Sequence, residues 1–139
     1  MTSHAPRRLL ETALYAADLD AAEAFYGGLL GLEKVSRAGN RHVFYRCGQG
    51  MLLIFNPEET RHASSGALPV PVHGATGAGH ACFAASAEEI AGWRRVFLAH
   101  GIAIEADFEW PNGARSLYVR DPAGNSIELA EPKLWNLGD

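Results

Sequence analysis

Short apolar runs and amphipathic segments alternate along the first half of the chain. Residues 9–17 form an apolar run that predicts a strand, and the carboxylate of Asp18 is suited to accept from the free amides of a helix start. Apolar residues then recur at three- and four-residue spacing over residues 19–30, which predicts an amphipathic helix that ends at Gly31. Strands are predicted after this helix, at residues 32–38, 41–47 and 51–56.

The second half repeats this order of elements. An apolar strand is predicted at residues 80–85, and Ser86 and Glu89 after it have the spacing of a capping box at a helix start. The helix is expected to end at Gly101. Strand-like runs follow at residues 102–109, 115–120 and 126–131, with turn residues between them.

A connection separates the two halves. Residues 57–78 are rich in proline and glycine and show neither helical nor strand periodicity. We therefore expect one domain over residues 1–139. It contains a first βαβββ module at residues 9–57, a linker at residues 58–78 and a second βαβββ module at residues 79–132.

The repeat is also visible in the residues themselves. ETALYAAD corresponds to HACFAASA, and LLIFNPE corresponds to IELAEPK. One module is too small to bury a sheet face alone, so the two are expected to pack together. The predicted fold is α+β, with two tandem βαβββ modules forming an open, curled eight-stranded mixed sheet with a central cleft.

Alignment of the two modules brings out residues with metal-binding chemistry. Glu11 then corresponds to His80, and Leu53 corresponds to Glu128. Because side chains alternate along a strand, Glu11, His80 and Glu128 are expected to face the cleft. One imidazole and two carboxylates suit an open site for a divalent ion such as Mn, Fe, Ni or Zn. The alternatives are a hydrogen-bonded core histidine, a solvated edge glutamate and a buried carboxylate with a basic or solvent partner.

Composition and charge limit the classes of partner. The chain has 139 residues, of which 47% are hydrophobic and 20% charged, as in an ordinary globular protein. The net charge of −4, without a dense basic stretch, argues against a nucleic-acid partner. Cys47 and Cys82 do not form a disulfide framework, and no apolar run approaches the roughly 20 residues of a membrane helix. We expect a cytoplasmic protein that binds no membrane.

Three segments resemble the vicinal oxygen chelate superfamily, which includes glyoxalase I, fosfomycin and bleomycin resistance proteins and extradiol dioxygenases. They are LYAADLDAAEAFYGGLLGLE, GHACF and SLYVRDPAGNSIELAEP, within a similarity over residues 9–132. The resemblance implies paired βαβββ modules, a homodimer, and metal ligands on the first and last strands of the modules. His80 and Glu128 match ligand positions, whereas Glu11 stands where a His or Gln is usual. Leu53 stands where glyoxalase I has a Glu, which counts against ordinary glyoxalase I chemistry.

Further residues are assigned to the same site. Tyr118 matches a family tyrosine that contacts substrate near the metal, and Glu128 and Tyr118 are therefore the candidate catalytic residues. The expected substrate-binding residues are Tyr118, Ser116, Arg120, Leu53, Phe55 and Trp110. For the apolar members of this set, a place in the core or in a dimer contact is the alternative.

Two functions compete on these grounds. The first is a divalent-metal-dependent enzyme, a lyase, isomerase or dioxygenase acting on a small oxygen-chelating metabolite or drug. The second is a metal-free protein of the bleomycin resistance type that sequesters a small molecule without chemistry. A third possibility is a structural paralogue whose site has lost its function.

Overall fold

The computed structural model describes residues 4–64 and 66–138, and the chain divides into two compact units. Unit 1 is Met1–Thr76 and unit 2 is Gly77–Asp139. No helix in the described part of the chain is long and apolar enough to cross a membrane.

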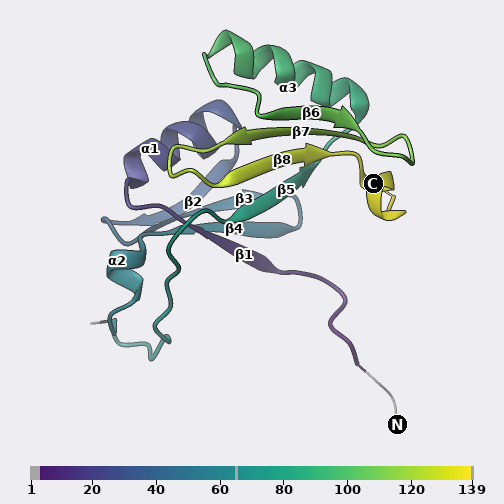
Figure 1. Cartoon of the computed structure of the whole chain (residues 1–139). Helices are drawn as coiled ribbons and strands as arrows, with labels where there is room; N and C mark the ends of the chain where they lie inside the picture. The colour runs from purple at the N-terminus through teal and green to yellow at the C-terminus, as the bar shows by residue number, and fades with distance from the viewer. Residues whose placement is uncertain (1–3, 65, 139) are drawn as a thin grey trace. The chain divides into compact units, whose positions relative to one another are not determined.

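Unit 1 contains one mixed sheet covered by a helix (Figure 1). Its elements are β1 (Glu11–Tyr15), α1 (Leu19–Glu23), the π-helical turn η1 (Ala24–Leu29), β2 (Glu33–Ala38), β3 (His42–Cys47), β4 (Gly50–Phe55) and α2 (Pro57–Thr60). The strand order is β1-β4-β3-β2, with β1 parallel to β4 and the other pairs antiparallel.

Unit 2 repeats the arrangement. Its elements are β5 (His80–Ala84), α3 (Ala87–Ala99), β6 (Ala106–Glu109), β7 (Arg115–Arg120), β8 (Ser126–Ala130) and the 3₁₀ turn η2 (Pro132–Trp135). The order β5-β8-β7-β6 again has one parallel pair and two antiparallel pairs. The predicted α+β class with two βαβββ modules and eight strands is therefore confirmed, and the strands form two four-stranded mixed sheets.

The two sheets share one register. Leu53 on β4 pairs with Phe44 on β3 and with Ala13 on β1. At the corresponding place in unit 2, Glu128 on β8 pairs with its two neighbours, Tyr118 on β7 and Cys82 on β5. The internal repeat inferred from the sequence thus holds residue by residue across the three strands that carry these residues.

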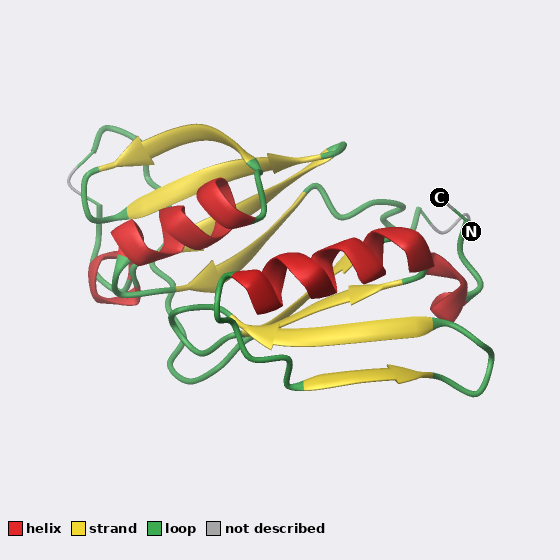
Figure 2. Cartoon of the chain, turned by 90° about the horizontal axis from the view of Figure 1, so that it is seen from above, coloured by secondary structure: helices red, strands yellow, loops and turns green. Residues whose placement is uncertain are grey.

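Each sheet packs one face against its own helix (Figure 2). In unit 1, α1 and η1 bury Leu19, Ala22, Phe25 and Tyr26. In unit 2, α3 buries Ile90 and Phe97. Ile127 and Leu129 are buried on β8, on either side of Glu128, so side-chain alternation turns Glu128 to the face away from these two residues.

Both helix starts and ends agree with the sequence prediction. Asp18 accepts from the amide of Ala21 at 3.0 Å, and Ser86 and Glu89 form the predicted capping box. Gly31 and Gly101 follow the helices with φ of 77° and 70°, a left-handed conformation that glycine adopts without strain.

Three boundaries differ from the prediction. Residues 57–60 form the short helix α2 instead of an irregular connection, because Asn56 caps the amide of Glu58 and Pro57 opens the first turn. The strand predicted from residue 102 begins only at Ala106. The predicted first helix changes from α to π geometry at Ala24.

Candidate functional site

One row of side chains crosses three strands of unit 2. Cys82, Glu128 and Tyr118 are register partners on β5, β8 and β7. Glu128 is only 5% exposed, which is rare for a carboxylate and requires polar partners. The partners of Glu128 therefore define this candidate site.

A two-step hydrogen-bond chain holds one oxygen of Glu128. Ser116 donates to Glu128 Oε2 at 2.5 Å, and Trp110 Nε1 donates to Ser116 Oγ at 2.7 Å. An indole nitrogen is only a donor, so the serine hydroxyl must accept from Trp110 and give its own hydrogen to Glu128. Oε1 is the oxygen that this hydrogen-bond chain leaves for another partner.

His80 faces that second oxygen. Its Nε2 lies 3.3 Å from Glu128 Oε1, and its Nδ1 lies 3.0 Å from the carbonyl oxygen of Ser126. A carbonyl only accepts, so Nδ1 carries a hydrogen and Nε2 is the nitrogen that meets the carboxylate. In the neutral imidazole this places a lone pair against a carboxylate oxygen, an arrangement that needs a proton or a metal cation between the two atoms.

The turn at residues 121–125 fixes the backbone beside His80. Asn125 Oδ1 accepts from the amide of Gly79 at 2.7 Å, and the amide of Ser126 donates to the Gly79 carbonyl at 2.9 Å. Asp121 accepts from the amide of Asn125 at 2.8 Å and closes the turn. The Asp-Pro-Ala-Gly-Asn segment therefore sets the start of β5 against β8.

An aromatic wall borders the pair formed by His80 and Glu128. The ring centroids of His80 and Tyr118 are 6.3 Å apart, those of Tyr118 and Phe108 are 6.0 Å apart, and those of Phe108 and Trp110 are 4.7 Å apart. Burial and the Glu128 carboxylate raise the pKa of Tyr118 to about 12, so the phenol keeps its hydrogen at neutral pH.

Two further residues of this face have other partners. The Arg120 guanidinium binds both oxygens of Glu105, at 2.7 and 3.0 Å, and donates to the Gly124 carbonyl at 3.0 Å. The atoms packed around the Cys82 thiol, together with Glu128, raise its pKa to about 12, although the residue keeps exposed surface. Arg120 therefore lies on the predicted face with its donors engaged, and Cys82 is a protonated thiol beside Glu128.

The three predicted metal ligands are divided between the units. His80 and Glu128 come together in unit 2, whereas Glu11 is the exposed first residue of β1 in unit 1. Within the described residues, neither unit gathers three His, Cys, Asp or Glu side chains into a cluster that would hold a metal. Unit 2 thus supplies two donors of the kind that Zn or Mn takes.

Unit 1 contains a cavity of about 440 Å³ on its own sheet. It includes two of the predicted substrate-binding residues, Leu53 and Phe55, which are buried at its floor. The full lining is Glu11, Arg41, His42, Phe44, Met51, Leu53, Phe55, Val70, Pro71 and His73.

Two histidines of this lining, His42 and His73, are not among the substrate-binding residues expected from the sequence. His42 lies at the register position that corresponds to Ser116, because His42 pairs with Phe55 as Ser116 pairs with Ala130. Alignment of the two modules therefore gives a sequence signal that places His42 on the sheet face corresponding to that of Ser116. His73 lies in the connection, where no periodicity predicts a position.

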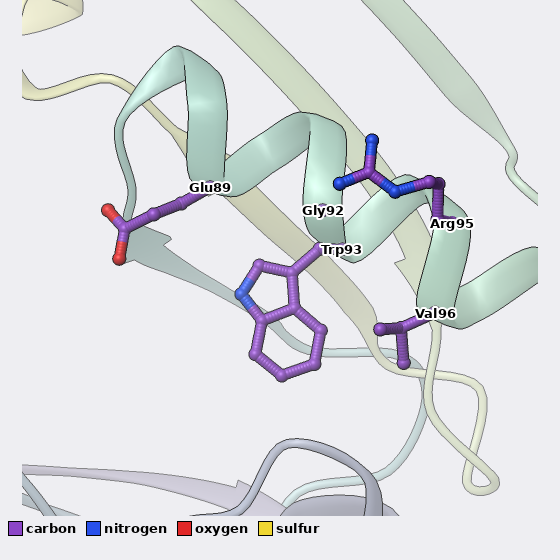
Figure 3. Close-up of a pocket in the computed structure, with 5 residues that line it drawn as sticks. All are labelled: Glu89, Gly92, Trp93, Arg95 and Val96. Atoms are coloured by element: carbon purple, nitrogen blue, oxygen red, sulfur yellow. The ribbon is translucent and has the colours of Figure 1, made fainter.

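A separate, open hollow of about 360 Å³ lies on α3 (Figure 3). It is lined by Glu89, Gly92, Trp93, Arg95 and Val96, all from this one helix. The Trp93 ring stacks on Phe97 at a centroid distance of 5.7 Å. Among the residues that the structure describes, no other helix or strand contributes to the lining of this hollow, and the lining contains no cluster of reactive side chains.

Comparisons with known proteins agree with this arrangement. The model of the glyoxalase/bleomycin resistance protein/dioxygenase superfamily matches residues 8–129. Among curated proteins, none matches the chain at a significant level.

Solved structures show the same fold. A lactoylglutathione lyase from Agrobacterium tumefaciens is 50% identical, with 96% of this chain and 99% of that chain covered and a TM-score of 0.91. A glyoxalase/bleomycin resistance protein/dioxygenase from Nocardioides is 21% identical over 93% of this chain and 85% of that one, with a TM-score of 0.71. A virulence protein from Salmonella typhimurium is 25% identical over 91% and 97%, with a TM-score of 0.67.

Proposed function

Because the chain belongs to the glyoxalase/bleomycin resistance protein/dioxygenase superfamily, we propose that it is a divalent-metal-dependent enzyme with lyase or isomerase chemistry. Its metal ligands are His80 and Glu128 of unit 2, with Glu11 of unit 1 as the third. Its substrate is a small molecule with adjacent oxygen atoms that can chelate the ion.

The observation that carries this proposal is the contact between His80 Nε2 and Glu128 Oε1 at 3.3 Å. The Ser126 carbonyl holds the imidazole in the tautomer whose Nε2 can bind a cation. Ser116 occupies the other oxygen of Glu128. Both donors are thus oriented by outer partners, as is usual for metal ligands.

The residues around this pair have distinct proposed roles. When bound, a divalent ion supplies Lewis acidity that stabilises an enolate or alkoxide oxygen. Tyr118, protonated at neutral pH, donates a hydrogen bond to a substrate oxygen. Ser116 and Trp110 act through Glu128 as positioning residues, since their polar atoms are bound to each other and to that carboxylate.

The substrate class follows from the similar lyase. That protein is named for lactoylglutathione, and half of its residues are identical to those of this chain. We therefore propose a thioester of a hydroxy acid, with lactoylglutathione as the first compound to test. Leu53 at the fourth ligand position leaves the ion one protein ligand fewer than glyoxalase I provides, so more of its coordination is open to substrate.

Metal content and thermal stability test the proposed ligands. Wild type, His80→Ala and Glu128→Gln are loaded with Mn, Fe, Ni or Zn and analysed by elemental mass spectrometry, with His62→Ala and Glu58→Gln as exposed controls. We expect about one equivalent of metal and a rise in Tm in wild type and in both controls, and loss of both effects in the two site variants. Lactoylglutathione turnover is then measured on each loaded protein.

The proposal is wrong if wild type takes up none of the four metals, or if both site variants retain metal as the controls do. Metal uptake without turnover of lactoylglutathione would keep the ligand assignment and overturn the substrate class.

A metal-free binding protein is the second candidate, and the cavity of unit 1 favours it. Leu53 and Phe44 stand where unit 2 has Glu128 and Tyr118, so the middle of this cavity is apolar, as the lining of a small-molecule binding site mostly is. A binder of this kind keeps its ligand affinity after chelation with EDTA and after His80→Ala, whereas the metalloenzyme loses activity in both cases.

A further inference from the structure

We propose that the cavity of unit 1 is a binding site for a carboxylate with a planar aromatic body, anchored by Arg41. This inference deepens the second candidate function, on whose cavity it rests, by naming the class of ligand; Glu11 of the lining is also the proposed third metal ligand, but none of the steps needs a metal.

Arg41 supplies the positive charge. Its Nη1 lies 2.9 Å from His42 Nδ1, and its guanidinium carbon lies 5.9 Å from the centre of the Phe55 ring. Within the described residues, no Asp or Glu oxygen lies within 4.0 Å of the guanidinium, in contrast to Arg37 and Arg46 on the same sheet. A guanidinium held beside a cavity without a counter-charge is suited to bind a carboxylate from outside.

His42 adds a neutral donor at the same end. Burial and the neighbouring Arg41 charge lower the pKa of His42, so its ring is neutral at physiological pH. Arg41 only donates, which makes His42 Nδ1 the acceptor and leaves the hydrogen on Nε2. The side chains of Arg41 and His42 therefore both carry hydrogen-bond donors, which a carboxylate can accept from.

Aromatic rings form the middle of the cavity. His42 stacks on Phe44 at a centroid distance of 4.0 Å, and Phe55 meets Phe44 edge-on at 5.4 Å. Leu53, the register partner of Phe44 on β4, is 7% exposed. These surfaces suit a flat apolar body better than a flexible polar chain.

The connection closes the cavity on one side. His73 lies 2.7 Å from the Tyr15 hydroxyl through its Nδ1, and its ring meets Phe55 edge-on at 4.5 Å. The amide of His73 donates to the Thr60 carbonyl at 3.0 Å. These contacts hold Val70 and Pro71 in the wall of the cavity.

The one acidic residue of the lining lies at the opposite end. Glu11 pairs with Met51, whereas His42, next to Arg41, pairs with Phe55 four residues further along β4. Four strand residues span about 13 Å, so the Glu11 carboxylate does not neutralise Arg41. The site thus has a cationic end, an aromatic middle and an acidic end.

Binding of naphthoate, followed by fluorescence and isothermal titration calorimetry, tests the proposal. We expect wild type to bind naphthoate, and to bind the neutral isostere naphthamide at least about tenfold more weakly. Arg41→Gln should lose about tenfold or more in naphthoate affinity, while Arg41→Lys retains more affinity than Arg41→Gln. Arg46→Gln removes the same charge from β3, outside the lining, and should bind as wild type does.

Equal binding of naphthoate and naphthamide would overturn the carboxylate assignment. Absence of naphthoate binding to wild type, or an equal loss in Arg41→Gln and Arg46→Gln, would overturn the site. The Tm of each variant is recorded to separate loss of binding from loss of folding. His80→Ala should leave naphthoate binding unchanged, so this result is independent of the metal ligands in unit 2.

Discussion

The orientation of the Glu128 carboxylate depends on a hydrogen bond from the buried hydroxyl of Ser116. Ser116 has no exposed surface, and its hydroxyl gives its hydrogen to Glu128 while it accepts from Trp110. Removal of the hydroxyl would leave the buried oxygen Oε2 of Glu128 without this donor. The carboxylate would then be free to turn away from His80.

Ser116→Ala is therefore expected to weaken metal binding by about tenfold to a hundredfold, the usual effect of losing an outer partner of a ligand. Metal affinity, measured by competition with a chromophoric chelator, is the readout. Ser126→Ala is the matched control, because the hydrogen bond between Ser126 and His80 uses the backbone carbonyl, which the substitution keeps. Equal affinities of wild type and Ser116→Ala would contradict the positioning role.

The residue scale also shows where sequence reasoning stopped. Alternation along one strand predicts that Ser116 and Tyr118 share one face, and the register places Glu128 opposite Tyr118. Alternation does not predict which side chains bond to each other. The link from Trp110 through Ser116 depends on side-chain rotamers and on the turn before β7, which a period of two residues does not encode.

At the scale of elements, one aspartate on β6 joins three segments of unit 2. Asp107 accepts from Arg94 on α3 at 2.6 and 2.9 Å and from Arg115 on β7 at 2.6 Å. The hydrogen bonds from both arginines keep the pKa of Asp107 below its ordinary value, and the Arg94 hydrogen bond contributes most. Arg94 binds both carboxylate oxygens of Asp107, and this bidentate geometry gives the strongest arginine–carboxylate contacts.

Asp107→Asn is expected to lower the free energy of unfolding by about 1–2 kcal/mol at pH 7. Because the folded pKa lies below the unfolded one, this stabilisation is present above about pH 4 and is lost as the pH falls through the folded pKa. Urea unfolding at neutral and acidic pH measures the difference. Asp20→Asn, whose side chain is 86% exposed, should change stability by less than about 0.5 kcal/mol.

Element boundaries were predictable only in part. The Asp18 cap, the capping box at Ser86 and the helix-ending glycines are local signals, and all of them hold. Helix α2 was missed because four residues are too few for periodicity, although Asn56 followed by Pro57 is a capping signal. The late start of β6 reflects pairing with β7, which begins only at Ala106.

At the scale of the whole molecule, the proposed metal ligands belong to different units. Glu11 is part of unit 1, whereas His80 and Glu128 are part of unit 2. A metal bound by all of them would link the stabilities of the two units, because each ligand lost on unfolding costs binding energy. Sedimentation velocity tests the expected homodimer.

Glu11→Gln should remove this link. In wild type, metal addition is expected to slow amide hydrogen exchange in β1 as well as in β5 and β8. In Glu11→Gln, the slowing should remain in unit 2 and disappear from β1, while Glu33→Gln, exposed on the same sheet, behaves as wild type. Unchanged protection of β1 in Glu11→Gln would exclude Glu11 as a ligand.

The shared register of the two sheets has a consequence for divergence after duplication. Each position on one sheet has a counterpart on the other, and Leu53 and Phe44 stand where unit 2 has Glu128 and Tyr118. Each sheet packs against the helix of its own unit, so the two sheets keep the same kind of core beneath different residues on this face. A duplicated gene of this kind can therefore specialise one copy for ionic chemistry and the other for apolar ligands while the backbone of both stays the same.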